Sequence, residues 1–411
     1  MKLSLSWIKD FVNIPEDMDL KQLAYDLTMS TVEVEDVEDL ARRFDNMVVG
    51  VIEKIEAHPN ADKLRVCKVD IGDGEIKDIV CGGINLEEGM RVAVSCPGAV
   101  VRWHGEGEPV VIKNSKLRGV ESYGMICASD EIGLGDLFPA EREAEILDLS
   151  AFDVPAGTPL ADALDMNDVL LEIDNKSMTN RPDLWGHYGI AREIAALYNL
   201  KLKEIEPFET DVQSDFHVEI LDPDRCTRYI GVEMSGVAVK PSPYKMQNRI
   251  WKAGMRPINA LVDITNYVML ATGNPTHAFD ADNITDHIVV RHAAEGEKLV
   301  LLNDKELSLC PDDLVITDSE GPVALAGVMG GAKDSILPKT ERVILEVANF
   351  EAAGIRRTAL RYDTRTEASS RYEKAIDPER CDQALALSMH YFKELYPELK
   401  VTGFCDNYVK K

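Results

Sequence analysis

Apolar side chains recur at near-helical spacing in the middle of residues 256–280, with Leu261, Ile264 and Val268 on one face. Gly273 follows at the position where a glycine commonly ends a helix. The pattern therefore predicts a helix here, followed by a loop that leads to His277. Polar residues interrupt the apolar set, which is more typical of a segment that holds a polar ligand than of a purely structural helix. These polar residues are Asn259, Asp263, Thr265 and Asn266.

Alternating apolar and polar positions predict strands over residues 48–57 and 64–71. Further short strand-like runs separated by glycine turns fill the rest of residues 40–150, a pattern that suggests a small barrel. Residues 1–39 predict only a strand, a helix and a second strand, which is too little for a domain. A helix is expected near the end of residues 151–200, and the polar stretch that follows is expected to be a linker.

Residues 211–400 mix both patterns and predict an α+β domain that contains the segment described first. Within it, Ser242 is expected to cap a helix that begins at Pro243 and is closed by Gly254. An otherwise apolar strand is expected at residues 343–348, with Glu346 as its one charged residue.

Composition sets the class of the protein. A chain of 411 residues with 45% hydrophobic and 28% charged residues is expected to form two to four globular domains. It has no apolar run long enough for a membrane span, its N-terminus is too polar for a signal peptide, and a cytoplasmic protein is expected. The eight cysteines lack metal-ligand spacing, so we expect reduced thiols and no metal site. A net charge of −27 opposes broad nucleic-acid binding and, taken alone, favours a metabolic enzyme.

The motifs change that expectation. Several short motifs, here called words, occur in order along the chain. A series of barrel words lies within residues 81–134, and an Asn-Arg-Pro-Asp word follows at residues 180–183. The later words are Arg-Pro-Ile-Asn from Arg256, Thr-Asn-Tyr from Thr265 and His-Ala-Phe-Asp from His277. Together they resemble the β subunit of bacterial phenylalanyl-tRNA synthetase over essentially the whole chain, which would correspond to the N-terminal portion of such a subunit.

The resemblance implies a multidomain α+β fold. An OB-fold tRNA-binding barrel at residues 40–150 would be inserted in a small discontinuous α/β domain made of residues 1–39 and 151–200. The editing domain, which hydrolyses aminoacyl-tRNA, would occupy residues 211–400. The Asn-Arg-Pro-Asp word is expected to tie a loop to a helix start rather than to take part in chemistry.

The resemblance also implies the function. The whole enzyme attaches phenylalanine to tRNA(Phe) with ATP and Mg²⁺ as an α₂β₂ assembly whose aminoacylation site lies in the α subunit. This chain would contribute tRNA binding and the hydrolysis of tyrosine wrongly attached to tRNA(Phe), without a cofactor of its own. An activated ester needs no protein nucleophile, and no nucleophile motif is present.

Candidate site residues follow from the matched motifs. A site that hydrogen-bonds the tyrosine hydroxyl would reject phenylalanine, and Glu346 is the candidate reader. His277 is expected to place the water or bind the terminal adenosine, although a lone histidine is more often structural. The candidate catalytic residues are His277, Glu346 and Thr366. The candidate substrate-binding residues are Arg256, Asn259, Gly330, Gly331 and Ala368. The candidate tRNA-binding residues are Lys63, Arg65, Lys68, Arg91, Lys116 and Arg118.

Two details of these candidates stay open at the level of sequence. Gly330 and Gly331 are expected either to permit positive φ and close approach of the backbone to a ligand, or simply to form a tight turn. Arg256 is expected to pair with a phosphate or with Asp280.

Two other functions are compatible with parts of the chain. One is a non-catalytic tRNA-binding or assembly module with a decayed editing site. The other is an unrelated acidic metabolic hydrolase, against which the ordered barrel words argue. A working editing site is favoured by the joint presence of five candidate residues, which are His277, Gly330, Glu346, Thr366 and Ala368.

Overall fold

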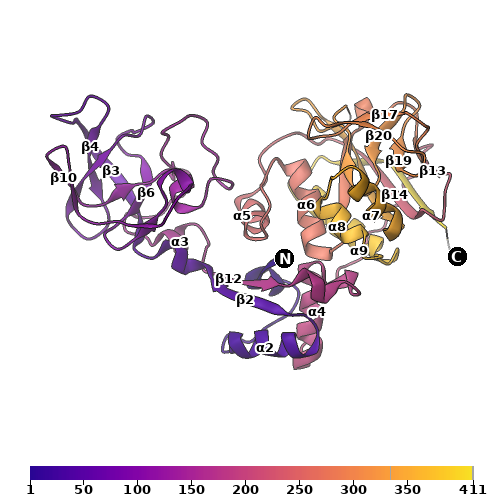
Figure 1. Ribbon diagram of the computed structural model, residues 1–411, viewed down its shortest axis with the longest axis horizontal. Helices are drawn as coiled ribbons and strands as arrows, with labels where there is room; N and C mark the ends of the chain where they lie inside the picture. Colours follow the sequence, from indigo (N-terminus) through magenta and orange to yellow (C-terminus); the bar gives the residue numbers. More distant parts are fainter. Residues whose placement is uncertain (334, 410–411) are drawn as a thin grey trace. The chain divides into compact units, whose positions relative to one another are not determined.

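The computed structural model describes residues 1–333 and 335–409, which form two compact units. Met1–Asp36 and Leu171–Lys411 form the first unit, and Val37–Leu170 forms the second (Figure 1). The predicted multidomain α+β class with a five-stranded barrel is confirmed. The finer prediction, that residues 1–39 plus 151–200 are a domain separate from residues 211–400, stays a prediction.

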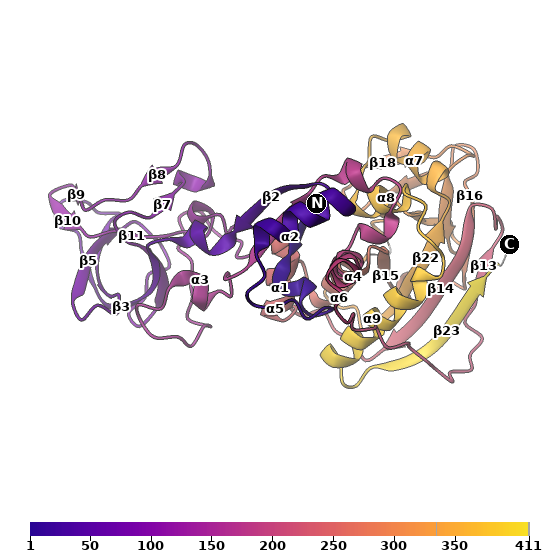
Figure 2. The same cartoon turned by 90° about the horizontal axis from the view of Figure 1, so that it is seen from below.

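A five-stranded antiparallel sheet in the order β11-β6-β3-β4-β5 curves into a nearly closed barrel in the second unit (Figure 2). Its strands are β3 (Met47–Ala57), β4 (Arg65–Asp70), β5 (Ile76–Cys81), β6 (Arg91–Ser95) and β11 (Met125–Ile126). Gly50 lies mid-strand in β3, where a Cβ would lie 2.6 Å from Val94 Cγ2 and 2.7 Å from Val69 Cγ1. The missing side chain thus lets the neighbouring strands pack tightly across the barrel.

Short strands and turns complete the second unit and connect it to the first. Strands β2 and β12 carry the chain into and out of the second unit and lie in one sheet, β1-β12-β2. The elements are β2 (Val34–Asp39), β7 (Val100–Val101), β8 (Val110–Val111), β9 (Ser115–Leu117), β10 (Val120–Ser122), α3 (Leu160–Ala163) and β12 (Val169–Ile173).

The first unit is built on an antiparallel sheet in the order β15-β22-β14-β23. Its strands are β14 (Cys226–Ser235), β15 (Thr276–Asp280), β22 (Arg342–Phe350) and β23 (Lys400–Tyr408). On β22, Val343, Leu345 and Val347 belong to one core, while Ile344, Ala348 and Phe350 belong to the other. The strand is therefore buried on both faces, which explains its nearly continuous apolar sequence.

Helices cover one face of this sheet and a second sheet covers the other. The helices are α5 (Tyr244–Lys252), α6 (Ala260–Thr272) and α9 (Arg380–Leu395). The second sheet contains β13 (Val218–Ile220), β16 (Ile288–His292), β19 (Leu314–Thr317), β20 (Pro322–Leu325) and β21 (Met329–Gly330). The hairpin of β17 (Lys298–Val300) and β18 (Glu306–Ser308) and the helices α7 (Ala352–Arg361) and α8 (Glu367–Tyr372) complete this part of the unit.

The N-terminal residues pack into the same unit through a buried ring stack. Trp7 stacks on His187 at 4.0 Å and on Tyr267 at 4.2 Å between ring centroids. The Ser4 backbone N–H donates to His187 Nε2 at 3.0 Å, and His187 Nδ1 donates to the Leu270 carbonyl at 2.8 Å. His187 is therefore the neutral tautomer with its proton on Nδ1, and it links three distant segments. The first segment contains β1 (Lys2–Ser4) and α1 (Leu5–Ile8), the second is α4 (His187–Tyr198) and the third is α6. Helix α2 (Leu20–Ser30) also belongs to this part of the unit.

The Asn-Arg-Pro-Asp word has the structural role that was predicted. Arg181 donates to both carboxylate oxygens of Asp183, at 2.9 and 2.8 Å, and to Glu193 at 2.7 Å. The loop is thus tied to α4 by charge-assisted hydrogen bonds.

The predicted end of α6 is confirmed, and the predicted start of α5 is wrong. Gly273 has φ 78° and follows the last residue of α6. Helix α5 begins at Tyr244, and the Ser242 hydroxyl donates to Asp263 at 2.5 Å instead of capping the helix. No helix in the described part of the chain is long and apolar enough to cross a membrane.

Deleting residues 37–170 and joining Asp36 to Leu171 with a short Gly/Ser linker is expected to leave a first unit that unfolds cooperatively. The two large cores on either face of the four-stranded sheet contain no residue from 37–170. Urea unfolding followed by both circular dichroism and tryptophan fluorescence checks this. Transitions that do not coincide would show that the first unit depends on the second.

Candidate active site

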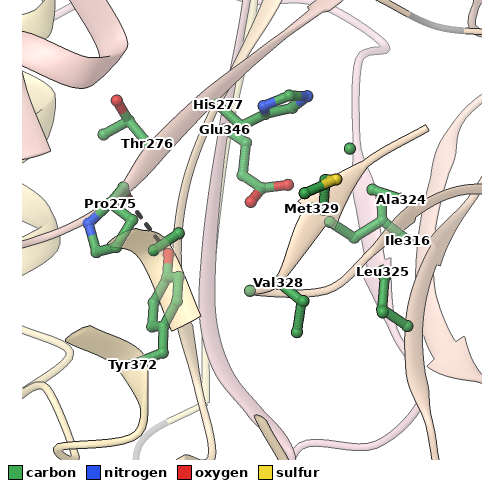
Figure 3. Close-up of a pocket in the computed structure, with 13 residues that line it drawn as sticks. Pro275, Thr276, His277, Ile316, Ala324, Leu325, Val328, Met329, Glu346 and Tyr372 are labelled. Carbon is green, nitrogen blue, oxygen red and sulfur yellow. Dashed lines mark hydrogen bonds between the residues drawn. The ribbon is translucent and has the colours of Figure 1, made fainter. Parts of the chain in front are cut away.

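A cavity lies within the first unit, between the four-stranded sheet, the second sheet and α8 (Figure 3). It is open to solvent on one side and contains about 380 Å³ of space, part of which is that solvent. Four of the predicted site residues line it, namely His277, Gly330, Glu346 and Ala368. The other lining residues are mostly apolar: Pro275, Thr276, Ile316, Ala324, Leu325, Gly327, Val328, Met329 and Tyr372.

Glu346 places a carboxyl group in this apolar surrounding. It lies on β22, only 5% of its surface is exposed, and its carboxyl group points toward the cavity (Figure 3). The Tyr229 hydroxyl donates to Oε2 at 2.8 Å, and no described residue hydrogen-bonds to Oε1. Burial raises the pKa of Glu346 to about 7, and the bond from Tyr229 partly opposes this rise. The carboxyl group is therefore poised between its neutral and ionised forms near neutral pH.

His277 lies directly opposite Glu346. Strand β15 pairs with β22 so that these two residues face each other across the ladder, with side chains on the same face of the sheet. The imidazole packs edge-on against Phe279, with 4.6 Å between ring centroids, and makes no hydrogen bond to any described residue. Burial lowers its pKa to about 4, so the ring is neutral near pH 7 and its nitrogens are available to a ligand or a water.

Position 330 requires glycine because the His277 ring occupies the space that a side chain would fill. A Cβ on Gly330 would lie 2.8 Å from both Cε1 and Nε2 of His277. Contact with the His277 ring thus explains this glycine, close approach to a ligand stays a prediction, and positive φ is wrong for both Gly330 and Gly331. Gly331 does not line the cavity. Its N–H donates to the Val323 carbonyl at 2.8 Å, and a Cβ there would lie 2.4 Å from that oxygen.

Helix α8 brings Ala368 and Tyr372 to the cavity, and Thr366 fixes the start of this helix. The Thr366 hydroxyl accepts from the Ser369 N–H at 3.0 Å and donates to the Val328 carbonyl at 2.8 Å. Thr366 does not itself line the cavity. Its observed role is to hold α8 against the segment that carries Val328, so any effect on chemistry is indirect.

Arg256 and Asn259 lie outside the cavity. Asn259 caps α6, because its side-chain oxygen accepts from the N–H groups of Leu261 and Val262 at 3.1 Å. Arg256 is exposed and does not pair with Asp280, whose carboxylate accepts instead from the Thr340 hydroxyl at 2.7 Å and the Asp282 N–H at 3.0 Å. The predicted substrate-binding role of Arg256 and Asn259 stays a prediction.

Comparison with known proteins agrees with this architecture. Residues 47–158 match the family described as "Putative tRNA binding domain", and residues 225–397 match the family described as "B3/4 domain". The phenylalanine–tRNA ligase beta subunit of Oceanobacillus iheyensis is 41% identical over 93% of this chain and 47% of its own length. That of Staphylococcus aureus strain RF122 is 40% identical over 98% of this chain and 50% of its own length. Nearly the whole chain is thus similar to phenylalanine–tRNA ligase β subunits.

Two further results concern the length of the relatives and the solved structures. The chain spans about half the length of the curated relatives it matches. Among solved structures, an N-terminal fragment of the phenylalanyl-tRNA synthetase β subunit from Pyrococcus horikoshii is 18% identical, with a TM-score of 0.26 over 44% of this chain and 56% of its own. A score this low does not bear on the fold.

Four of the six candidate tRNA-binding residues lie on adjoining loops of the second unit. Lys63 and Arg65 flank the start of β4, and Lys116 and Arg118 lie on the β9–β10 hairpin. The two loops touch, because His58 Nε2 hydrogen-bonds the Leu117 carbonyl at 3.1 Å and Asn60 donates to the Arg118 carbonyl at 3.0 Å. All four basic side chains belong to exposed residues.

The other two candidate tRNA-binding residues are engaged with acidic partners. Lys68 pairs with Asp78 at 2.7 Å, and Arg91 pairs with Asp153 at 2.9 Å. They therefore contribute less unbalanced positive charge than the four residues on the two loops.

No sequence pattern marks Tyr229 as a site residue. It lies on β14, and its contact with Glu346 depends on the pairing of β14 with β22, which places Gly231 opposite Glu346 and Tyr229 opposite Ala348. Tyr229 and Glu346 are thus diagonal neighbours on one face of the sheet. No local pattern announces such a contact between strands that are far apart in the sequence.

Glu346→Gln is expected to remove a pH dependence of stability. With its pKa raised from about 4.5 to about 7, the native protein retains a proton that the unfolded chain loses, so stability falls as pH rises through this interval. The wild-type free energy of unfolding should fall relative to the variant by on the order of 3 kcal/mol between pH 4.5 and 7.5. Urea unfolding at several pH values measures this.

Glu341→Gln is the matched control, because Glu341 is exposed at the entry to the same strand. His277, whose pKa is lowered, contributes the opposite slope below pH 6.5 in all three proteins and cancels from the comparison. Equal pH dependence in wild type and Glu346→Gln would contradict a raised pKa at Glu346.

Proposed function

We propose that this cavity hydrolyses the ester bond of tRNA(Phe) wrongly charged with tyrosine. The observation that carries the proposal is the carboxyl group of Glu346, which is buried in an apolar cavity with one oxygen held by Tyr229, the other oxygen without a partner among the described residues, and a neutral imidazole opposite. A phenolic hydroxyl group is the kind of ligand group that such a carboxyl oxygen recognises.

Selectivity follows from the cost of leaving a buried polar group without a partner. A tyrosyl side chain gives Glu346 Oε1 a hydrogen-bond partner, whereas a phenylalanyl side chain offers none and displaces water from around the oxygen. A site built to bind a hydroxyl rejects the analogue that lacks it by several kcal/mol in favourable cases, on the order of 10⁴-fold. The cavity thereby distinguishes the wrong ester from the right one by its hydroxyl group alone.

Hydrolysis itself needs one positioned water molecule. The water oxygen attacks the ester carbonyl carbon, the bond to the ribose oxygen breaks, and that oxygen takes up a proton, which yields free tyrosine and tRNA with a free hydroxyl. A neutral His277 can accept a hydrogen bond from the attacking water or bind the terminal adenosine. Gly330 makes room for the His277 ring, and the small side chain of Ala368 leaves room for the amino acid beside it.

The second unit is proposed to bind the tRNA. Its exposed basic residues on two adjoining loops form a local positive surface in a chain of net charge −27. Such a surface attracts phosphates locally while the remainder of the protein repels them.

In the whole protein we propose that this chain works with a synthetase α subunit, in an α₂β₂ assembly of the cytoplasm that attaches phenylalanine to tRNA(Phe) with ATP and Mg²⁺. Within residues 1–333 and 335–409, no group of three or more His, Cys, Asp or Glu side chains is arranged to hold a metal ion.

Binding of tRNA is expected to weaken steeply with salt. If four phosphates are neutralised by Lys63, Arg65, Lys116 and Arg118, the logarithm of the affinity should fall with the logarithm of salt concentration with a slope of about −3 to −4. Fluorescence anisotropy with tRNA(Phe) over a salt series measures this slope. Replacement of Lys116 and Arg118 by Ala should reduce it by about 2, whereas replacement of the ion-paired Lys68 should change it less. A slope that the double replacement leaves unchanged would place the tRNA elsewhere.

Glu346→Ala is expected to abolish most of the preference for the tyrosyl ester, because the carboxyl group that penalises phenylalanine is gone. His277→Ala should slow hydrolysis of the tyrosyl ester by roughly tenfold to a thousandfold. The measurement is single-turnover hydrolysis of Tyr-tRNA(Phe) and Phe-tRNA(Phe), with Glu341→Ala as an exposed control and thermal melts for each variant.

A wild-type chain that binds tRNA(Phe) but hydrolyses neither ester would favour the alternative function, a non-catalytic tRNA-binding or assembly module. A Glu346→Ala variant that keeps the wild-type preference would show that this carboxyl group is not the reader.

A further inference from the structure

Glu346 has two carboxyl oxygens, and among the described residues only one of them has a hydrogen-bond partner. We propose that Tyr229 is a positioning residue for specificity, which holds Oε2 of Glu346 so that Oε1 alone is presented to the hydroxyl group of the amino acid. This inference rests on the proposed function and adds to it a residue that never touches the substrate.

The geometry supports a dedicated role for this hydrogen bond. Tyr229 is fully buried, and its hydroxyl donates to Glu346 Oε2 at 2.8 Å. Tyr372, the tyrosine among the described cavity-lining residues, directs its hydroxyl to the carbonyl groups of Pro275 and Ala348, at 3.2 and 3.1 Å, and so does not compete. Rotation of the carboxyl group would break the bond from Tyr229 and leave a buried hydroxyl without a partner, at a cost comparable to a lost hydrogen bond.

The bond also determines which oxygen can change its protonation. Because the Tyr229 hydroxyl donates, Oε2 must accept, and a proton on the carboxyl group is therefore carried by Oε1. The oxygen that faces the ligand can then accept a hydrogen bond from a phenol when the carboxyl group is ionised, or donate one when it is neutral. A pKa of about 7 for Glu346 keeps both forms accessible.

The other titratable groups that face Glu346 are few. They are His277 on β15, Cys226 on β14 beside Tyr229, and Tyr372 on α8. Burial raises the pKa of Cys226 and of Tyr372 well above their usual range, so neither ionises near pH 7. No described lysine or arginine forms an ion pair with Glu346. Removal of the bond from Tyr229, which favours the ionised form, should therefore raise the pKa of Glu346 with little opposition.

The test uses the full 411-residue chain with Tyr229→Phe and measures hydrolysis of Tyr-tRNA(Phe) and Phe-tRNA(Phe) from pH 5.5 to 9. The ratio of the two rates should fall roughly fivefold to tenfold at neutral pH. The pH at which this ratio changes should move upward relative to wild type. Tyr396→Phe is the matched control, since that buried tyrosine loses a 2.7 Å bond to the Ala238 carbonyl and does not line the cavity.

Incorporation of 3-fluorotyrosine at position 229 keeps the side chain and makes its hydroxyl a stronger donor, so the same pH midpoint should move downward. This second variant keeps the test decisive if Tyr229→Phe does not fold. Upward and downward shifts in the two variants would support the inference, and a midpoint unchanged in both would overturn it.

Glu346→Ala, measured in parallel, separates the two proposals. Loss of preference in Glu346→Ala with wild-type behaviour in both Tyr229 variants would overturn only the role of Tyr229. Unchanged preference in Glu346→Ala would overturn the proposed function together with the inference that depends on it.

Discussion

The first unit depends on how it accommodates a carboxyl group in the middle of a strand that is buried on both faces. An isolated charge in such a place is costly, and proteins respond by neutralising it or by supplying hydrogen bonds. Here both responses are present in part. Tyr229 supplies one hydrogen bond, and burial raises the pKa of Glu346 to about 7. A carboxyl group kept only for stability would be expected to have partners on both oxygens, so the oxygen left facing a cavity is best explained by a ligand.

The cavity stays open because glycines pack against bulky side chains around it. Gly330 makes room for the His277 ring, and Gly327, with φ 65°, lies where a Cβ would come within 3.1 Å of Ile355, Phe350 and Tyr372. These close approaches hold the two sheets and α8 at fixed distances, since neither glycine can be enlarged without moving a packed ring. The space in the cavity is thus a product of tight packing around its rim.

Sequence alone predicted much of this unit because its signals are local. The helix of residues 260–272, its closing glycine and the apolar strand with Glu346 carry patterns readable within a few positions, whereas the resemblance to a known family indicated Gly330 and Ala368. Polar residues are harder to interpret from local patterns. Asn259 caps α6 and Asp263 accepts from the Ile258 N–H at 2.7 Å, so both side chains serve the backbone in this structure, whatever else they bind. Polar side chains that satisfy backbone groups and those that bind a ligand look alike in sequence.

Long-range register is what sequence could not supply. His277 lies opposite Glu346, and Tyr229 is the diagonal neighbour of Glu346. Both contacts follow only from the strand order β15-β22-β14 and its pairing register. This register has a consequence for the chemistry. With the pKa of His277 near 4 and that of Glu346 near 7, the two facing groups do not form a permanent ion pair at neutral pH. With no fixed ion pair, the proposed discrimination between tyrosine and phenylalanine rests on whether one carboxyl oxygen finds a hydrogen-bond partner. The residues that aim that oxygen then matter as much as the carboxyl group itself.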